Sequence, residues 1–147
     1  MVLLSAVVLA CPGLAGSAQA ASDPTYAASY ATKAHVATNQ ARARHDLRAL
    51  RKSRCLQTYA ERQAAAMAAQ GELFHQDLGA VLSGCHLSGA GENVAYGFAT
   101  GKAVVKGWMH SPGHRANILN KRYRYLAVDA WRSTSTNYVY VTQDFAG

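Results

Sequence analysis

The order of the sequence patterns predicts an α+β domain in which helices cover a small antiparallel sheet. Ala-rich helical periodicity dominates the first two thirds of the chain. Two alternating segments, 123–131 and 138–145, follow near the C-terminus and flank the polar stretch 133–137. Alternation of apolar and polar residues is typical of strands with one buried face, so these segments are expected to form an antiparallel hairpin.

The chain has 147 residues, half of them hydrophobic, which suits one domain with a modest core. Its net charge is +7, and a basic surface favours nucleic acid, anionic lipid head groups or acidic wall polymers as partners. The basic residues crowd into segment 42–54 without interleaved aromatic residues or a groove-reading motif, so no specific nucleic-acid site is expected. A solvated face is favoured there over a specific anion site.

The N-terminus resembles a secretory signal peptide. Val2–Ala10 is a short apolar run, and Ala18-Gln19-Ala20 follows as a cleavage site. We therefore divide the chain into a signal peptide over residues 1–20, a short linker over 21–25 and a domain over 26–147. No Lys or Arg precedes the apolar run, and lipidation at Cys11 remains an alternative to cleavage after Ala20. No later stretch reaches the length of a transmembrane helix.

Removal of Cys11 with the signal peptide leaves Cys55 and Cys85. Export places this pair in an oxidising compartment, which favours a disulfide over two separate buried thiols. Such a bridge closes a loop of roughly 30 residues and would contribute about 3–4 kcal/mol in the chain-entropy model.

A long first helix is predicted over residues 26–45, with Ala28, Ala31, Val36 and Ala43 as its apolar positions. Residues 46–50 form a bend that turns two leucines inward. A second helix follows, because Ser53 suits an N-cap and Gly71 a C-terminal stop.

The middle of the chain is expected to be mostly loop. Residues 83–91 are rich in Gly and Ser, and Glu92 is expected to project from the loop that follows. Thr100 suits the N-cap of a third helix, which should stop before Pro112. Ser111 then caps another helix whose first turn contains His114. The positive end of the helix dipole disfavours an imidazolium there, so His114 should be mostly neutral near pH 7.

Five pieces of sequence together resemble the CAP superfamily, which includes cysteine-rich secretory proteins, antigen 5 and pathogenesis-related proteins, and in particular its secreted bacterial SCP-like members. In chain order these pieces are Asn39-x-x-Arg42 with Leu47 and Leu50, His75, Gly91-Glu92-Asn93-Val94-Ala95, Trp108-Met109-x-Ser111-Pro112-Gly113-His114-Arg115-x-Asn117-Ile118-Leu119, and Tyr140-x-x-Gln143-x-Phe145. The resemblance implies an α-β-α sandwich with a cleft that holds two histidines and acidic partners.

Carried over residue by residue, the histidines of that cleft are His75 and His114, and its first acid is Glu92. The position of the second acid is occupied by Ser111, so the set is one acid short. His75, His114 and Glu92 could bind a divalent metal such as Zn²⁺, and we expect weak binding because the protein supplies few ligands. No catalytic residue is assigned: Ser111, His114 and Glu92 could form a nucleophile, base and acid, but an N-cap serine already uses its oxygen.

The resulting expectation is a secreted, non-catalytic binding module. Members of the family are reported to bind sterols, fatty acids or other apolar ligands, so a lipid or cell-envelope ligand is expected. The alternative is a metal-assisted hydrolase that acts outside the cell.

Overall fold

The computed structural model describes residues 24–147, and the predicted signal peptide, Cys11 and residues 21–23 lie outside the described residues. The first helix begins at Pro24, so the last two residues assigned to the linker are helical. The elements are α1 (Pro24–Ala43), β1 (Arg51–Lys52), α2 (Arg54–Gln70), α3 (Leu78–Cys85), β2 (Ala90–Tyr96), α4 (Gly101–Met109), α5 (Pro112–Ile118), β3 (Tyr125–Arg132) and β4 (Val139–Ala146).

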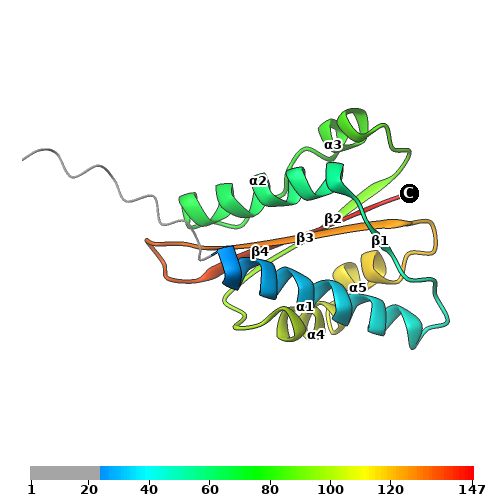
Figure 1. Ribbon diagram of the computed structural model, residues 1–147, viewed down its shortest axis with the longest axis horizontal. Helices are drawn as coiled ribbons and strands as arrows, with labels where there is room; N and C mark the ends of the chain where they lie inside the picture. The colour runs from blue at the N-terminus through cyan, green and yellow to red at the C-terminus, as the bar shows by residue number, and fades with distance from the viewer. Residues whose placement is uncertain (1–23) are drawn as a thin grey trace, which may run out of the picture.

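The elements form three layers, which confirms the predicted α+β sandwich. Figure 1 shows α2 and α3 on one side of the sheet, and α1, α4 and α5 on the other. The strand order is β1-β3-β4-β2. The predicted hairpin is present as β3 and β4, and β2 pairs antiparallel with β4. The sheet is not wholly antiparallel as expected, because the two-residue β1 runs parallel to β3.

The helix ends with clear chemical signals lie where they were predicted. The Ser53 side chain accepts a hydrogen bond from the Leu56 N–H at the start of α2, and Gly71 ends that helix with a left-handed φ of 72°. The Thr100 side chain accepts from the Ala103 N–H at the start of α4. These contacts pair backbone groups that have no partner inside the helix.

The predicted apolar face of α1 is wrong. Val36 is 49% exposed, whereas the buried apolar residues are Tyr30, Ala34, Ala37 and Ala41. Many positions of this helix are alanine, so apolar residues fall on every side and the periodicity alone distinguishes the faces poorly.

The expected loop over residues 83–91 is present only over 86–89, and the loop setting expected of Glu92 is wrong. Residues 78–85 form α3, which the Asp77 side chain caps by accepting from the Gly79 N–H at 2.8 Å. Ala90–Tyr96 forms β2, so Glu92 lies in a strand and is 5% exposed. β2 is covered on both faces, so its sequence does not alternate between apolar and polar residues as a half-exposed strand does. Its partner strand β4 lies about fifty residues away in the sequence.

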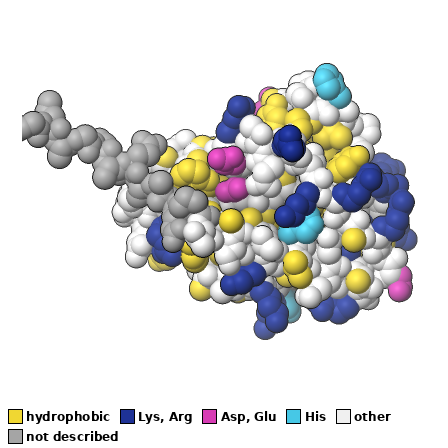
Figure 2. Space-filling model, viewed as in Figure 1, with side chains coloured by type: hydrophobic (Ala, Val, Ile, Leu, Met, Phe, Trp, Pro, Cys, Tyr) yellow, Lys and Arg dark blue, Asp and Glu magenta, His cyan; other side chains and the backbone are white. Residues whose placement is uncertain are grey.

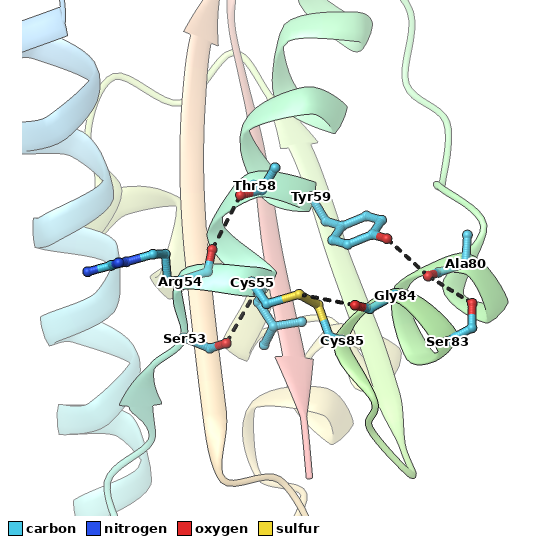
Figure 3. The surroundings of a disulfide bond; sticks show 10 residues. Ser53, Arg54, Cys55, Thr58, Tyr59, Ala80, Ser83, Gly84 and Cys85 are labelled. Carbon is cyan, nitrogen blue, oxygen red and sulfur yellow. Dashed lines mark hydrogen bonds between the residues drawn. A yellow bond between two sulfur atoms is a disulfide. The ribbon is translucent and has the colours of Figure 1, made fainter.

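The predicted disulfide between Cys55 and Cys85 is present, with the two Cα atoms 5.8 Å apart. It joins the first turn of α2 to the end of α3, as Figure 3 shows. Tyr59, one turn further along α2, donates its hydroxyl to the Ala80 carbonyl of α3. These two contacts fix α3 against α2.

Arg42 does not belong to a solvated face, in contrast to the prediction for the basic segment. Its side chain is buried, and the residue is 1% exposed. The guanidinium donates to the carbonyl oxygens of Arg48, Ile118 and Asn120. Arg42 therefore links the end of α1 to the end of α5, while Arg44, Arg48, Arg51, Lys52 and Arg54 are exposed as expected.

Candidate functional site

The predicted site residues lie around β2, the edge strand opposite β1. Glu92 is on β2 itself, and His75 lies in the connection between α2 and α3. Ser111 and His114 lie at the start of α5, in the other helical layer. The site is thus built where segments from both layers meet at one edge of the sheet.

His75 and Glu92 form a direct contact. The Nδ1 atom of His75 lies 2.6 Å from Oε1 of Glu92, and among residues 24–147 no other acidic side chain lies within 4 Å of a His, Lys or Arg side-chain nitrogen. The His75 side chain is 63% exposed, whereas that of Glu92 is 1% exposed. A carboxylate that holds Nδ1 fixes the ring orientation and leaves Nε2 directed elsewhere.

A second acid, Asp144, lies beside Glu92 and was missed by the sequence prediction. The two residues are register partners on β2 and β4. The Gln76 side-chain amide donates to Glu92 Oε2 at 2.6 Å and to Asp144 Oδ1 at 2.9 Å. Burial, and then the charge of Glu92, raises the pKa of Asp144 well above its ordinary value. The pair therefore favours one protonated carboxyl group, since two buried carboxylates side by side repel each other.

Ser111 and His114 form the other half of the site. Ser111 precedes α5 as predicted, but its side chain makes no capping bond; its Oγ lies 2.9 Å from His114 Nδ1 instead. The prediction that the helix N-terminus uses this oxygen is therefore wrong. Burial, and then the charge of His75, lowers the pKa of His114. The neutral state expected of His114 is thus supported, although burial rather than the helix dipole is the main cause.

Amide side chains hold α5 against β2. Asn93 donates to the His114 carbonyl and to Gln143 Oε1, and Asn117 donates to the Glu92 carbonyl. The sequence analysis includes these residues in the segments that resemble the CAP superfamily but assigns them no structural or functional role. The one available signal was Gln143, whose position on an apolar strand face requires a hydrogen-bond partner.

The geometry brings the predicted residues together but does not assemble a serine triad. Glu92 contacts His75, while Ser111 contacts His114, so acid and serine do not share one imidazole. Nor does any group of three or more His, Cys, Asp and Glu side chains within residues 24–147 form a cage for a metal ion. The site therefore offers the imidazole of His75 beside the buried acid pair and, at the start of α5, the imidazole of His114.

A three-layer α-β-α domain with two histidines and an acid at the sheet edge defines a CAP, or SCP-like, domain. The chain belongs to this family: the sequence model of the cysteine-rich secretory protein family (CAP) matches residues 36–145. This confirms the resemblance found in the sequence.

Two proteins of Bacillus subtilis (strain 168) align with part of the chain. The uncharacterized membrane protein YlbC is 45% identical over 56 residues, which is 38% of this chain and 14% of YlbC. The uncharacterized protein YkwD is 47% identical over 58 residues, which is 40% of this chain and 21% of YkwD. The aligned segments thus span less than a quarter of these relatives.

Solved structures share the fold. An extracellular protein with an SCP domain from Bacillus anthracis superposes with a TM-score of 0.73 at 28% identity, over 82% of this chain and 41% of that one. An outer surface protein of Borrelia burgdorferi gives a TM-score of 0.66 at 19% identity, over 76% of this chain and 87% of that one. Among the described helices of this chain, none has the length and apolar character needed to cross a bilayer.

Proposed function

We propose that the protein is a secreted, non-catalytic binding module that holds a divalent metal ion weakly between His75 and His114. The observation that carries this proposal is that Nδ1 of each ring has a partner, Glu92 or Ser111. Each Nε2 atom then remains available as a ligand, and histidines oriented through Nδ1 are common at zinc sites. Glu92 acts as the outer partner of His75. Secretion is supported by the extracellular relative from Bacillus anthracis.

Calorimetric titration of the disulfide-intact protein with Zn²⁺ should detect one weak site at about pH 7.5 and almost none at about pH 5, on either side of the ordinary imidazole pKa. An imidazolium cannot bind a metal, and the lowered pKa of His114 keeps that ring neutral at neutral pH. His114→Ala should abolish binding, and Ser111→Ala should weaken it about tenfold by releasing the ring. His110→Ala, a change at an exposed histidine, is the matched control. Binding that persists in a His75→Ala, His114→Ala double variant would place the metal elsewhere.

A separate groove of about 750 Å³ lies between α1 and α4, and we assign the apolar ligand to it. Its walls include Ala37, Ala41, Ala103, Val105 and Met109, and cationic side chains stand around it, namely Arg44, Lys102 and Lys106. An apolar wall with a cationic rim complements an acyl chain with an anionic head group. We infer that the envelope ligand is of this kind.

Filling this groove should prevent acyl-chain binding. Ala103 is exposed on α4 and lines the groove, so Ala103→Phe places a ring there with little effect on the core. Palmitate binding, measured by displacement of a fluorescent fatty acid, should weaken at least about tenfold, the loss of roughly 1.4 kcal/mol. Ala69→Phe, at an exposed position on α2, is the control. Lys102→Gln, Lys106→Gln should weaken palmitate more than hexadecanol, and equal palmitate binding by the Ala103→Phe variant would contradict this use of the groove.

The alternative, a metal-assisted hydrolase, has weaker support. It requires a base that accepts a proton from metal-bound water. Glu92 is held by His75 through Oε1 and by Gln76 through Oε2, and its side chain is only 1% exposed, so solvent has almost no access to its oxygens. This arrangement favours a positioning role for Glu92.

A further inference from the structure

A second pocket lies at the opposite edge of the sheet, away from His75 and His114. β1 pairs with β3 only at Tyr125 and Leu126, so the rest of β3 has no strand beside it on this edge within the described residues. Figure 1 shows β3 passing here between α2 and α1. The hollow between the two helices has a volume of about 440 Å³.

The acidic end of this pocket is Asp129. Its Oδ2 accepts a hydrogen bond from the Gln57 side chain at 2.7 Å, and its Oδ1 accepts from the Ala130 N–H at 2.9 Å. Burial raises the pKa of Asp129 to about 6, and the charge of Glu61 contributes to this increase. No Lys or Arg among residues 24–147 lies within 4 Å of this carboxylate. Asp129 is thus a well-ordered carboxylate that lacks a cationic partner.

The basic end of the same pocket is formed by Lys52 and Arg54, both exposed. Neither has an ion-pair partner in the described part of the chain. Figure 2 shows Lys and Arg side chains spread over much of this face and acidic side chains at only a few places on it. The pocket therefore separates opposite charges that do not neutralise each other.

The distance between the two ends limits the size of a ligand. Lys52 is the register partner of Leu126, three residues before Asp129 on β3. Three residues of a strand span about 10 Å. A peptide spans at most about 3.5 Å per residue, so a chain of two or three residues fits between the side chains. Ala28 and Ala31 of α1 also line the pocket and give it an apolar wall that suits small side chains.

We propose that this pocket binds short zwitterionic peptides of two or three residues with small side chains. The peptide ammonium group lies on Asp129, and its carboxylate lies between Lys52 and Arg54. Each end makes a charge-assisted hydrogen bond, which is roughly twice as strong as a neutral one. The inference is independent of the metal and acyl-chain proposals, since none of its residues belongs to either site.

The test is an NMR titration of the ¹⁵N-labelled protein with Ala-Ala and Ala-Ala-Ala. Saturable shifts are expected at the amides of Gln57, Val128 and Asp129. N-acetyl-Ala-Ala lacks the ammonium group and Ala-Ala-amide lacks the carboxylate, so each should bind at least about tenfold more weakly. The double change Lys52→Gln, Arg54→Gln alters exposed side chains and should weaken free Ala-Ala by a similar factor while Ala-Ala-amide is unaffected. Lys33→Gln, at an exposed position on α1, is the control.

The Asp129→Asn variant tests the other end of the pocket. It should bind free Ala-Ala and N-acetyl-Ala-Ala with similar affinity, because the carboxylate that favours the ammonium group is absent. A correct fold in this variant is checked by its unchanged amide spectrum outside the pocket. The proposal is wrong if no peptide gives saturable shifts at peptide concentrations up to about 20 mM, which would detect a Kd on the order of millimolar. It is also wrong if blocked and free peptides bind equally, or if the shifts gather at the α1–α4 groove or around His114.

Discussion

Replacement of Arg42 by Met should lower the free energy of unfolding by about 3 kcal/mol or more. The guanidinium is 2.7–2.9 Å from the carbonyl oxygens of Arg48, Ile118 and Asn120, and water does not reach it. A buried acceptor left without its donor costs about 1–3 kcal/mol. Among residues 24–147 this buried cation has no acidic partner, and its removal offsets part of the loss, so the total should stay below the sum of the costs of three unpaired acceptors.

Urea denaturation followed by circular dichroism measures the effect. Arg44→Met is the matched control, since Arg44 lies two residues away and is exposed. Arg42→Lys should be intermediate, because an ammonium group keeps the charge but cannot reach three carbonyls with a rigid fork. Equal stability of the Arg42→Met and Arg44→Met variants would show that the carbonyls find other partners and that Arg42 does not hold the ends of α1 and α5 together.

Helix boundaries could be predicted from the sequence because their causes are local. Ser53, Thr100 and Gly71 act within four residues of their own positions. Pro112 likewise ends one helix and starts the next. The hairpin of β3 and β4 could be predicted for the same reason, since its strands are joined by a short loop.

β2 could not be predicted because its partner strand β4 is distant in sequence. α3 has a local cap, Asp77, but its glycine and serine residues are typical of a loop. Gly91 in β2 is typical of a loop, yet a Cβ atom there would clash with the Tyr123 hydroxyl oxygen. Gly84 in α3 similarly faces the ring of Tyr59. Glycine is used at these positions for close packing between elements, and close packing cannot be recognised without the fold.

The site was predictable in its residues more than in its arrangement. The resemblance identified His75, Glu92 and His114, and the contact of His75 with Glu92 is made across 17 residues. Asp144 could not be predicted as part of the site because its position beside Glu92 depends on the register between β2 and β4. Serine before a helix usually accepts a hydrogen bond from a backbone N–H of the first turn, which is why the sequence predicts that role for Ser111. In the structure its hydroxyl contacts Nδ1 of His114 instead, one turn further along the chain.

Loss of the disulfide should lower the free energy of unfolding about as much as Arg42→Met does. It should also weaken Zn²⁺ binding at the site of His75 and His114. Replacement of Cys55 and Cys85 by Ala opens a loop closed across 30 residues, which costs about 3–4 kcal/mol in the chain-entropy model and lowers Tm by about 10 °C or more. That loop contains His75 and Gln76, which precede α3. Zn²⁺ affinity should therefore fall as well, because greater freedom of α3 loosens the contact of His75 with Glu92.

Scanning calorimetry with and without dithiothreitol separates the contribution of the bridge from the side-chain changes. The reductant should lower Tm of the wild type to nearly that of the double variant and leave the variant itself unchanged. His86→Ala, next to the bridge and exposed, is the control for local disturbance. If the Cys55→Ala, Cys85→Ala variant has a lower Tm while its Zn²⁺ affinity, measured without reductant, is preserved, the bridge stabilises the fold but does not position His75. If neither quantity changes, the contacts of Tyr59 with α3 suffice to hold this layer, and the stabilising role assigned to the disulfide is wrong.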